Sequence, residues 1–327
     1  VSAIGDVFPS DALSGHVVRL PADLRAGEVT PTTVLSGLKR PVDCVVADLN
    51  GDQRPDLVVA QFGNYLGRLA WFETLPDAQH REHSLVEVPG ALKVVVRDLT
   101  GDGRPDVLAQ MAQGREGLFL HENQGQGTFL ARTLVEFPPA YGSTGFELAD
   151  FDGDGRDDLL VTNGDNGEYA SPFKRYHGLR IFRNEGGLRF REQWFFPMNG
   201  AFKAQARDFD GDGDLDLVGI SYFPDYERSP EESLVYLENR GSWTFAPYTI
   251  DEPLMGRWLT MDSGDVDGDG DVDVVVGAFN DGPRGTPVPA AVQEGWRSRP
   301  VAAVLLRNQT RKHGLGNVAR ESQGPRQ

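Results

Sequence analysis

The chain has 327 residues, of which 49 are acidic and 32 are basic, so its formal net charge is −17. Because contact with nucleic-acid phosphates requires a basic surface, this charge argues against a nucleic-acid partner. The single cysteine, Cys44, excludes a disulfide within the sequence, and no run of 18 apolar residues is present that could span a membrane.

A short apolar stretch, His16–Leu20, and a strand-like segment, Thr32–Leu38, precede a series of five acidic loops. The loops cover residues 48–56, 98–106, 150–158, 208–216 and 265–273, and we call them loops one to five. Their first aspartates are 50, 52, 58 and 57 residues apart, which is the near-constant period of a repeat architecture. The chain therefore consists largely of one repeated unit.

Oxygen-bearing side chains occupy positions 1, 3, 5 and 9 of every loop, and glycine occupies position 4. Alternate side chains of a tightly turned loop can point at one centre, and Ca²⁺ takes roughly six to eight oxygen ligands. We therefore predict up to five Ca²⁺ ions. The predicted ligands are Asp48, Asn50, Asp52, Asp56, Asp98, Thr100, Asp102, Asp106, Asp150, Asp152, Asp154, Asp158, Asp208, Asp210, Asp212, Asp216, Asp265, Asp267, Asp269 and Asp273.

The loops differ in ligand charge. Loops three to five have four aspartates at these positions, whereas loop one has Asn50 and loop two has Thr100 at position 3. Loop one also has Gln53 in place of the second glycine. Because ligand charge tunes Ca²⁺ affinity, we expect loops one and two to lose calcium first.

Each loop lies between two segments rich in β-branched residues, such as Val42–Ala47 and Leu57–Gln61 around loop one. A third segment ends in a turn such as Asn123-Gln124-Gly125, whose residues suit a hairpin, and a fourth segment returns. Four antiparallel strands per repeat predict an all-β fold, a β-propeller of four-stranded blades. We expect a single domain over residues 1–310, with repeats that start near 42, 92, 144, 202 and 258, and a polar basic tail at 311–327.

The two ends of the repeat region indicate how the blades close. The fifth repeat stops at Asn308-Gln309-Thr310, before a fourth strand. Thr32–Leu38 precedes the first repeat as a fourth strand precedes each later one, so we expect it to complete the last blade and close a ring of five. The alternative is that residues 1–30 belong to a degenerate sixth blade, and a count of six or more stays open.

The repeats resemble the FG-GAP/VCBS family over about residues 32–308. The family includes the propeller heads of integrin α subunits, and this sequence is most similar to its exported bacterial members, through segments such as Gln61-Phe62-Gly63-Asn64 and Phe223-Pro224-Asp225-Tyr226. In the family the acidic loop joins the first two strands of a blade and binds Ca²⁺, which the resemblance implies for all five loops. Family members usually have seven or eight blades, more than the five repeats found in this chain.

If the calcium loops share one face, the connections between second and third strands lie on the opposite face. These connections are long at Asn163–Gly178, Ser221–Ser233 and Phe279–Pro300, and long loops on a rigid scaffold often carry function. Their side chains suit a sugar or a protein partner, although they could instead pack loop on loop. The candidates from these connections are Asp165, Asn166, Tyr169, Tyr176, His177, Asp225, Tyr226 and Asn280. The connections from one blade to the next lie on the same face and add Tyr141, Asn199, Arg257 and Trp258.

We therefore expect a non-enzymatic, calcium-stabilised binding module or accessory subunit of an extracellular or envelope assembly, with a protein or carbohydrate partner. Weak calcium loops are useful where calcium is plentiful, which favours an extracellular or periplasmic location after removal of a signal peptide. The alternative is a carbohydrate-active enzyme that resembles polysaccharide lyases. In that case His177, Tyr176 and Asp165 would supply a base, an acid and an orienting carboxylate.

Overall fold

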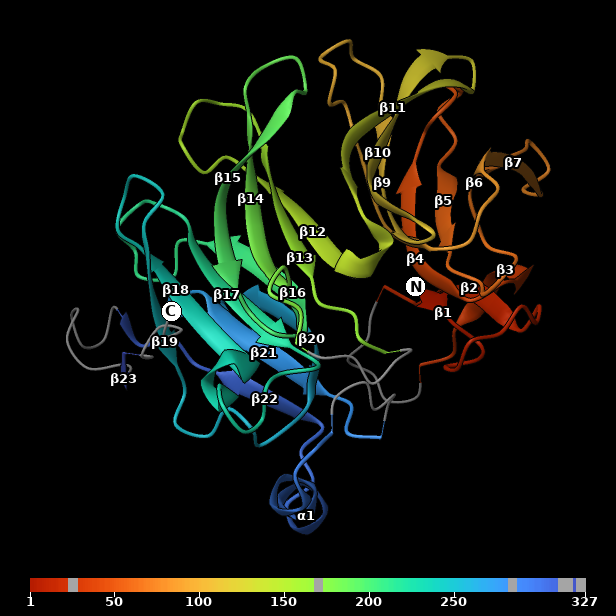
Figure 1. Ribbon diagram of the computed structural model, residues 1–327. Helices are drawn as coiled ribbons and strands as arrows, with labels where there is room; N and C mark the ends of the chain where they lie inside the picture. The colour runs from red at the N-terminus through yellow and green to blue at the C-terminus, as the bar shows by residue number, and fades with distance from the viewer. Residues whose placement is uncertain (23–28, 168–172, 282–286, 311–319, 322–327) are drawn as a thin grey trace. The chain divides into compact units, whose positions relative to one another are not determined.

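The computed structural model describes residues 1–22, 29–167, 173–281, 287–310 and 320–321. These residues form antiparallel sheets, with one α-helix and two short 3₁₀ helices (Figure 1). The chain divides into two compact units, unit 1 from Val1 to Ala140 and unit 2 from Tyr141 to Gln327. Each unit contains three sheets of strands that follow one another in sequence.

Unit 1 begins with a three-stranded sheet and continues with two four-stranded meanders. The first sheet consists of β1 (Ser2–Ala3), β2 (Gly15–Arg19) and β3 (Thr32–Leu38). The second consists of β4 (Pro41–Ala47), β5 (Asp56–Gln61), β6 (Arg68–Thr74) and β7 (His80–Val86), and the third of β8 (Ala91–Arg97), β9 (Asp106–Gln113), β10 (Arg115–Gly125) and β11 (Thr128–Phe137).

The 3₁₀ turn η1 (Pro139–Tyr141) leads into unit 2, which also contains three sheets. Its first sheet consists of β12 (Ser143–Ala149), β13 (Asp158–Asn163), β14 (Gly178–Asn184) and β15 (Phe190–Pro197). The second consists of β16 (Ala201–Arg207), β17 (Asp216–Ser221), β18 (Leu234–Asn239) and β19 (Phe245–Thr249), to which β23 (Arg320–Glu321) adds an edge. The third consists of β20 (Trp258–Gly264), β21 (Asp273–Ala278) and β22 (Ala303–Leu306).

Within each unit the sheets pack face to face in sequence order. In unit 1, Val59 of β5 packs with Val17 of the first sheet, and its neighbour Val58 packs with Val94 of the third. In unit 2, β17 is likewise covered on both faces. Because β5 and β17 lie between two sheets, their sequences are continuous apolar runs and not alternating patterns. These packed meanders are the blades of a β-propeller, which confirms the predicted all-β fold.

The structure corrects the role predicted for Thr32–Leu38. This segment is β3, and it pairs with β2 in a sheet of residues 1–38 instead of serving as a lone closing strand. The physical reason is that Val17 and Leu35 bury together against the next sheet, so β2 and β3 fold as one layer. The alternative, an additional blade that includes the N-terminal residues, agrees with this pairing. The sheet of β20 to β22 has three strands among the described residues, as its sequence predicted.

The connection between β21 and β22 contains α1 (Ala290–Ser298), which we had expected to be a loop. It begins after Pro289 and buries Trp296, whose indole N–H donates to the carbonyl of Leu254 at 2.8 Å. Among the described residues, neither this helix nor any other has the length and apolar composition needed to cross a membrane.

Candidate metal centres and the opposite face

The five loops share one hydrogen-bonded frame. In loop two, the Asp98 carboxylate accepts bonds from the N–H groups of Gly101 and Gly103, at 2.7 and 2.8 Å, while Asp106 accepts one from Leu99 at 3.0 Å. The bonds from position 6 to position 1 and from position 2 to position 9 recur in all five loops. Gly101 has a φ of 79°, a left-handed conformation that favours glycine at position 4. The frame therefore fixes two carboxylates at opposite ends of each loop.

The aspartate at position 9 is buried in every loop and begins the second strand of its sheet. Its other oxygen accepts a bond of 2.7 or 2.8 Å from the backbone N–H at the end of the third strand. Burial raises the pKa of Asp56 and Asp158, and it raises the pKa of Asp216 to about 6. A bound cation would favour the ionised form of these carboxyl groups.

An asparagine at the end of the third strand joins neighbouring loops. The Asn123 amide donates to the carbonyl of Pro105 in its own loop, at 3.0 Å, and to that of Leu49 in loop one, at 2.9 Å. Asn308 does the same in unit 2, with a bond of 2.5 Å to Phe209 of loop four. The predicted hairpin turns are therefore also part of the loop scaffold.

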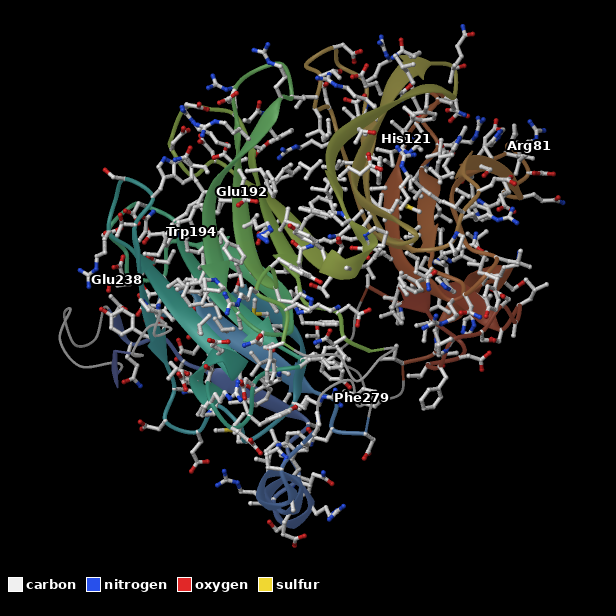
Figure 2. The ribbon with its side chains drawn as sticks, viewed as in Figure 1. Arg81, His121, Glu192, Trp194, Glu238 and Phe279 are labelled. Carbon is white, nitrogen blue, oxygen red and sulfur yellow. The ribbon has the colours of Figure 1, made fainter. Side chains whose placement is uncertain are left out.

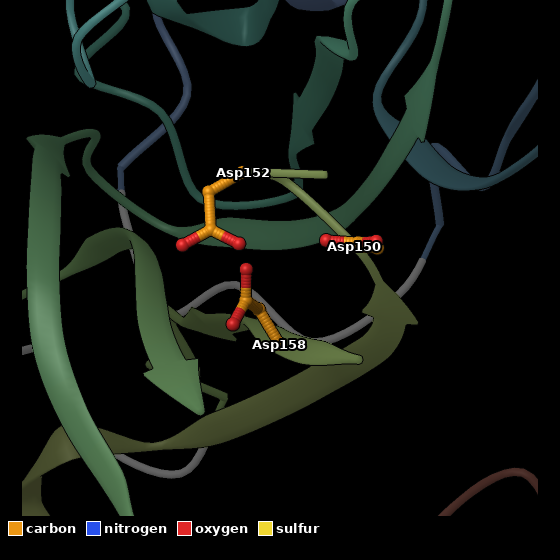
Figure 3. A group of neighbouring side chains, drawn as sticks. All are labelled: Asp150, Asp152 and Asp158. Atoms are coloured by element: carbon orange, nitrogen blue, oxygen red, sulfur yellow. The ribbon is translucent and has the colours of Figure 1, made fainter. Parts of the chain in front are cut away.

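Three groups of carboxylates converge in unit 2. Figure 3 shows Asp150, Asp152 and Asp158 of loop three around a common centre. In each group the three candidate ligand oxygens lie within 4.8 Å of one another. Two oxygens bound to one Ca²⁺ at 2.3–2.6 Å can be at most roughly 5 Å apart, so these residues fit a shared calcium ion. The other two groups are Asp208, Asp210 and Asp216 in loop four, and Asp265, Asp267 and Asp269 in loop five.

The side chain at position 7 separates the loops into two classes. Arg54, Arg104 and Arg156 occupy it in loops one to three, and each guanidinium pairs with the aspartate at position 5 of its own loop. Loops four and five have Asp214 and Asp271 there. Burial and the neighbouring aspartates raise the pKa of Asp214. This arginine recurs visibly in the sequence, but we had not predicted its role.

The neighbouring third strand adds a further charge. In loop three, Arg183 of β14 donates to Asp152 at 2.5 Å. In loop four the corresponding residue is Glu238, an acidic side chain of β18 (Figure 2). Burial raises the pKa of Asp210, with smaller contributions from Asp212 and Glu238. Loop four therefore concentrates more negative charge than loop three.

Loops one and two have no converging group of three acidic side chains among the described residues. Asn50 stands at position 3 of loop one, where its amide donates to Asp52 at 3.0 Å. Thr100 offers a neutral oxygen in loop two. Both loops have an oxygen-bearing side chain at each ligand position, but one of these side chains is neutral where loops three to five have a carboxylate.

On the opposite face, the structure buries half of the predicted candidates. Asn166, His177, Asp225, Tyr226, Arg257 and Trp258 are all less than 7% exposed. Tyr141, Asp165, Tyr176, Asn199 and Asn280 are half-buried, and Tyr169 lies outside the described residues. A partner at this face would therefore reach the half-buried side chains before the buried ones.

Arg257 organises the buried side chains of unit 2. Its guanidinium lies 3.8 Å from the centre of the Tyr222 ring and donates to the Tyr222 carbonyl at 2.9 Å. Asn280 accepts a bond from the Arg257 backbone, and Tyr226 packs edge-on against Trp296 of α1. These residues pack loop on loop, the alternative considered for this face.

A second cluster lies around Tyr176. Its ring stacks on that of Tyr141 with centroids 4.6 Å apart, and its carbonyl accepts a bond from the buried Arg180. His177 is 1% exposed, and burial, with Lys174 and Arg180, lowers its pKa to about 3. The Asp165 carboxylate accepts the N–H of Gly167 within its own turn. A buried imidazole of such low pKa is a weak base.

The chain is similar to several known proteins. The T-cell immunomodulatory protein homolog of Plasmodium falciparum is 27% identical over 139 residues, which cover 38% of this chain and 18% of that protein. The chain thus spans less than a fifth of that relative's length. A crystal structure of a Lactobacillus plantarum protein is 14% identical, covers 86% of this chain and 89% of its own, and gives a TM-score of 0.45. The GH32 β-fructofuranosidase of Bombyx mori is 13% identical, and the match covers 75% of this chain and 64% of that protein with a TM-score of 0.37.

The FG-GAP-like repeat matches residues 48–109, 98–161 and 208–276. Each match starts at position 1 of one acidic loop, continues through the next loop, and ends in the strand that directly follows it. The three matches together include all five loops. They cover more than half of the 327 residues, and the chain belongs to the FG-GAP-like repeat family.

Proposed function

We propose that this protein is a calcium-stabilised β-propeller that acts as a binding module, with its partner on the face opposite the acidic loops. The observation that carries the proposal is the convergence of three carboxylates in each of loops three to five, on a loop frame that recurs five times. A single propeller domain over residues 1–310 and an extracellular or periplasmic location, where Ca²⁺ is abundant, are parts of the same proposal.

In this proposal Ca²⁺ supplies positive charge at the centre of each loop. The side chains at positions 1, 3, 5 and 9 would hold it, and those at positions 1 and 9 are already oriented by backbone N–H groups. Because only the folded chain assembles these ligands, bound calcium would stabilise the fold. Each site at tenfold excess over its Kd adds about 1.4 kcal/mol.

The half-buried aromatic pair Tyr141 and Tyr176 supports a binding role for the opposite face. Stacked tyrosines offer rigid contact area to a sugar ring or a protein side chain. In the FG-GAP-like repeat family the propeller is an interaction module, and the partner here is proposed to be a carbohydrate or a protein.

The test is a screen of the calcium-loaded protein against acidic and neutral polysaccharides that reads both retention and new reducing or unsaturated ends. We expect retention without products, and at least tenfold weaker retention for Tyr176→Ala. Tyr248→Ala, which removes a half-buried tyrosine of β19, is the matched control and should bind normally. Product formation that disappears in a His177→Ala variant would overturn the binding-module proposal in favour of an enzyme.

A further inference from the structure

A connection in unit 1 binds a carboxylate that comes from a distant part of the chain. The backbone N–H groups of Asn64, Tyr65 and Leu66 donate to the Asp11 carboxylate at 2.8, 3.0 and 2.9 Å. Successive N–H groups that point at one site form an anion-binding nest. These residues join β5 to β6, at the end of β5 opposite loop one. The nest therefore lies at the end of its sheet opposite the acidic loop.

In other repeats, the backbone N–H groups of the equivalent connection donate to an aspartate of that same connection. Asp165 accepts the N–H of Gly167 at 2.7 Å, and Asp225 accepts those of Glu227 and Arg228 at 3.2 and 3.0 Å. The sequence from residue 62 to 67 contains no acidic residue. In this repeat the anion and its receptor are thus separate parts of the chain, which can come apart.

Arg40 extends the receptor along the same N-terminal segment. Its guanidinium donates to the carbonyls of Asp6 and Val7, at 3.3 and 3.2 Å, and is held in place by a bond of 2.7 Å to the carbonyl of Gly63. The receptor therefore recognises two adjacent peptide carbonyls and a carboxylate four residues further along. That combination is the chemistry of an extended peptide and not of a sugar.

Residues 5–14, which we call the strap, are held almost entirely by polar contacts. None of them is buried, and Val7, Phe8 and Leu13 are 53%, 67% and 64% exposed. Segments with few buried apolar contacts open locally at low free-energy cost. The strap can therefore leave its receptor without disrupting the blades.

Large apolar side chains border the nest and remain exposed. Tyr65 is 82% exposed and Leu66 is 58% exposed. Exposed aromatic and aliphatic side chains beside a polar anchor are typical contact residues of interfaces. An external peptide can gain contacts here that Asp11 and its neighbours do not make.

We propose that the β5–β6 connection and Arg40 form a binding site for an extended acidic peptide segment of a partner protein, and that the strap is its internal placeholder. The matching ligand carries a carboxylate four residues after a pair of free backbone carbonyls, with apolar residues that reach Tyr65 and Leu66. This inference rests on the proposed binding function and assigns one ligand class to it.

The test uses a fluorescent synthetic peptide with the sequence of residues 6–14 and full-length protein. Replacing Asp11→Asn removes the internal competitor, so the variant should bind the probe at least tenfold more tightly than the unchanged protein. Asp77→Asn is the matched control, because Asp77 also accepts a backbone N–H in a turn of unit 1, from Gln79 at 3.1 Å. It should leave probe affinity unchanged, and a probe in which the aspartate for residue 11 is asparagine should not bind.

Equal probe affinity for the Asp11→Asn variant and the unchanged protein, with the same circular dichroism and Tm, would overturn the proposal. Competition by an acidic polysaccharide as strong as that by unlabelled peptide would overturn the peptide assignment. A second measurement needs no variant: hydrogen exchange of strap amides should be at least a hundredfold faster than that of β2, and equal rates would also contradict the proposal.

The two functional proposals fail separately. The peptide assay reports on a connection that contains no calcium ligand, whereas the polysaccharide screen and its Tyr176→Ala variant report on unit 2. A negative peptide result with normal polysaccharide retention would remove only the acidic-peptide site.

Discussion

The acidic loops of unit 1 and unit 2 have the same backbone frame but balance their charge differently. In unit 1, Arg54 and Arg104 place a guanidinium on the aspartate at position 5, and a neutral side chain replaces one carboxylate. In unit 2, carboxylates converge in all three loops, and loops four and five have aspartate where the arginine would be. The comparison teaches that some repeats carry their own counter-charge, whereas others would need an added cation to balance their carboxylates.

Loop three lies between these two cases. It has four aspartates and a converging group, but Arg156 and Arg183 both contact its carboxylates. Loop four is the opposite extreme, with Asp214 at position 7 and Glu238 nearby. Dependence on calcium should therefore increase from the loops of unit 1, through loop three, to loop four.

Removing calcium should produce the largest difference between the units. Three unit 2 sites at tenfold excess over Kd would contribute about 4 kcal/mol together, and excess EDTA would remove this stabilisation. We expect amides of β17 and β21 to exchange hydrogen much faster in EDTA, while those of β5 change less. Hydrogen exchange with mass spectrometry in EDTA and in calcium measures this directly.

Equal loss of protection in both units would show that the arginines do not replace the ion. A melting curve unaffected by EDTA, with calcium shown to be absent, would contradict calcium stabilisation altogether.

Acid should destabilise each unit through one buried histidine, an effect that is separate from the loss of calcium. Burial lowers the pKa of His121, in β10 of unit 1 (Figure 2), to about 4, and that of His177 in unit 2 to about 3. In the unfolded chain each imidazole binds a proton as the pH falls below about 6.5, whereas in the folded chain it stays neutral until the pH approaches 4 or 3. The stability of the folded chain is therefore unaffected by these groups above pH 6.5 and declines as the pH falls towards 4 or 3. At pH 5 the loss is about 2 kcal/mol per histidine.

The measurement is the free energy of unfolding from pH 7 to 5 for the unchanged protein, His121→Gln and His177→Gln. Each variant should show a shallower decline, whatever its stability at pH 7. Burial raises the pKa of carboxyl groups such as Asp216, so these groups favour the folded chain as the pH falls. The informative quantity is therefore the difference in the free energy of unfolding between the unchanged protein and each variant. Parallel pH profiles would mean that these imidazoles are protonated in the folded chain.

Exchanging the residue at position 7 should give the smallest effect and test the comparison most directly. Asp214→Arg introduces into loop four the arginine of loops one to three. In EDTA it should raise stability by about 0.5–1 kcal/mol, the range of a partly exposed ion pair, and in calcium the gain should shrink. Chemical denaturation under both conditions measures it.

Asp251→Arg changes the net charge equally at an exposed position away from the loops, and it serves as the control. If both substitutions stabilise the calcium-free protein by the same amount, the effect is one of overall charge and not of position 7.

Much of the fold could be predicted because its signals are local. Each loop and its two strands are contiguous, and glycine at position 4 reports a backbone conformation directly. The burial of Trp258 and Arg257 could not be read in this way, because large side chains in long connections look alike whether they fill a core or face a partner. Likewise, the pairing of β3 with β2 depends on burial against the next sheet, and the contact of Asp11 with Asn64 joins residues far apart in sequence.

In two repeats, the asparagine at the end of the third strand couples neighbouring loops. Asn123 touches a carbonyl of loop one while its backbone N–H holds Asp106 of loop two, and Asn308 connects loops four and five in the same manner. An ion that orders one loop would also order the amide that supports the next. Each such pair of loops would then bind ions cooperatively: the second ion would bind more readily than the first, and the loss of one would weaken the binding of the other.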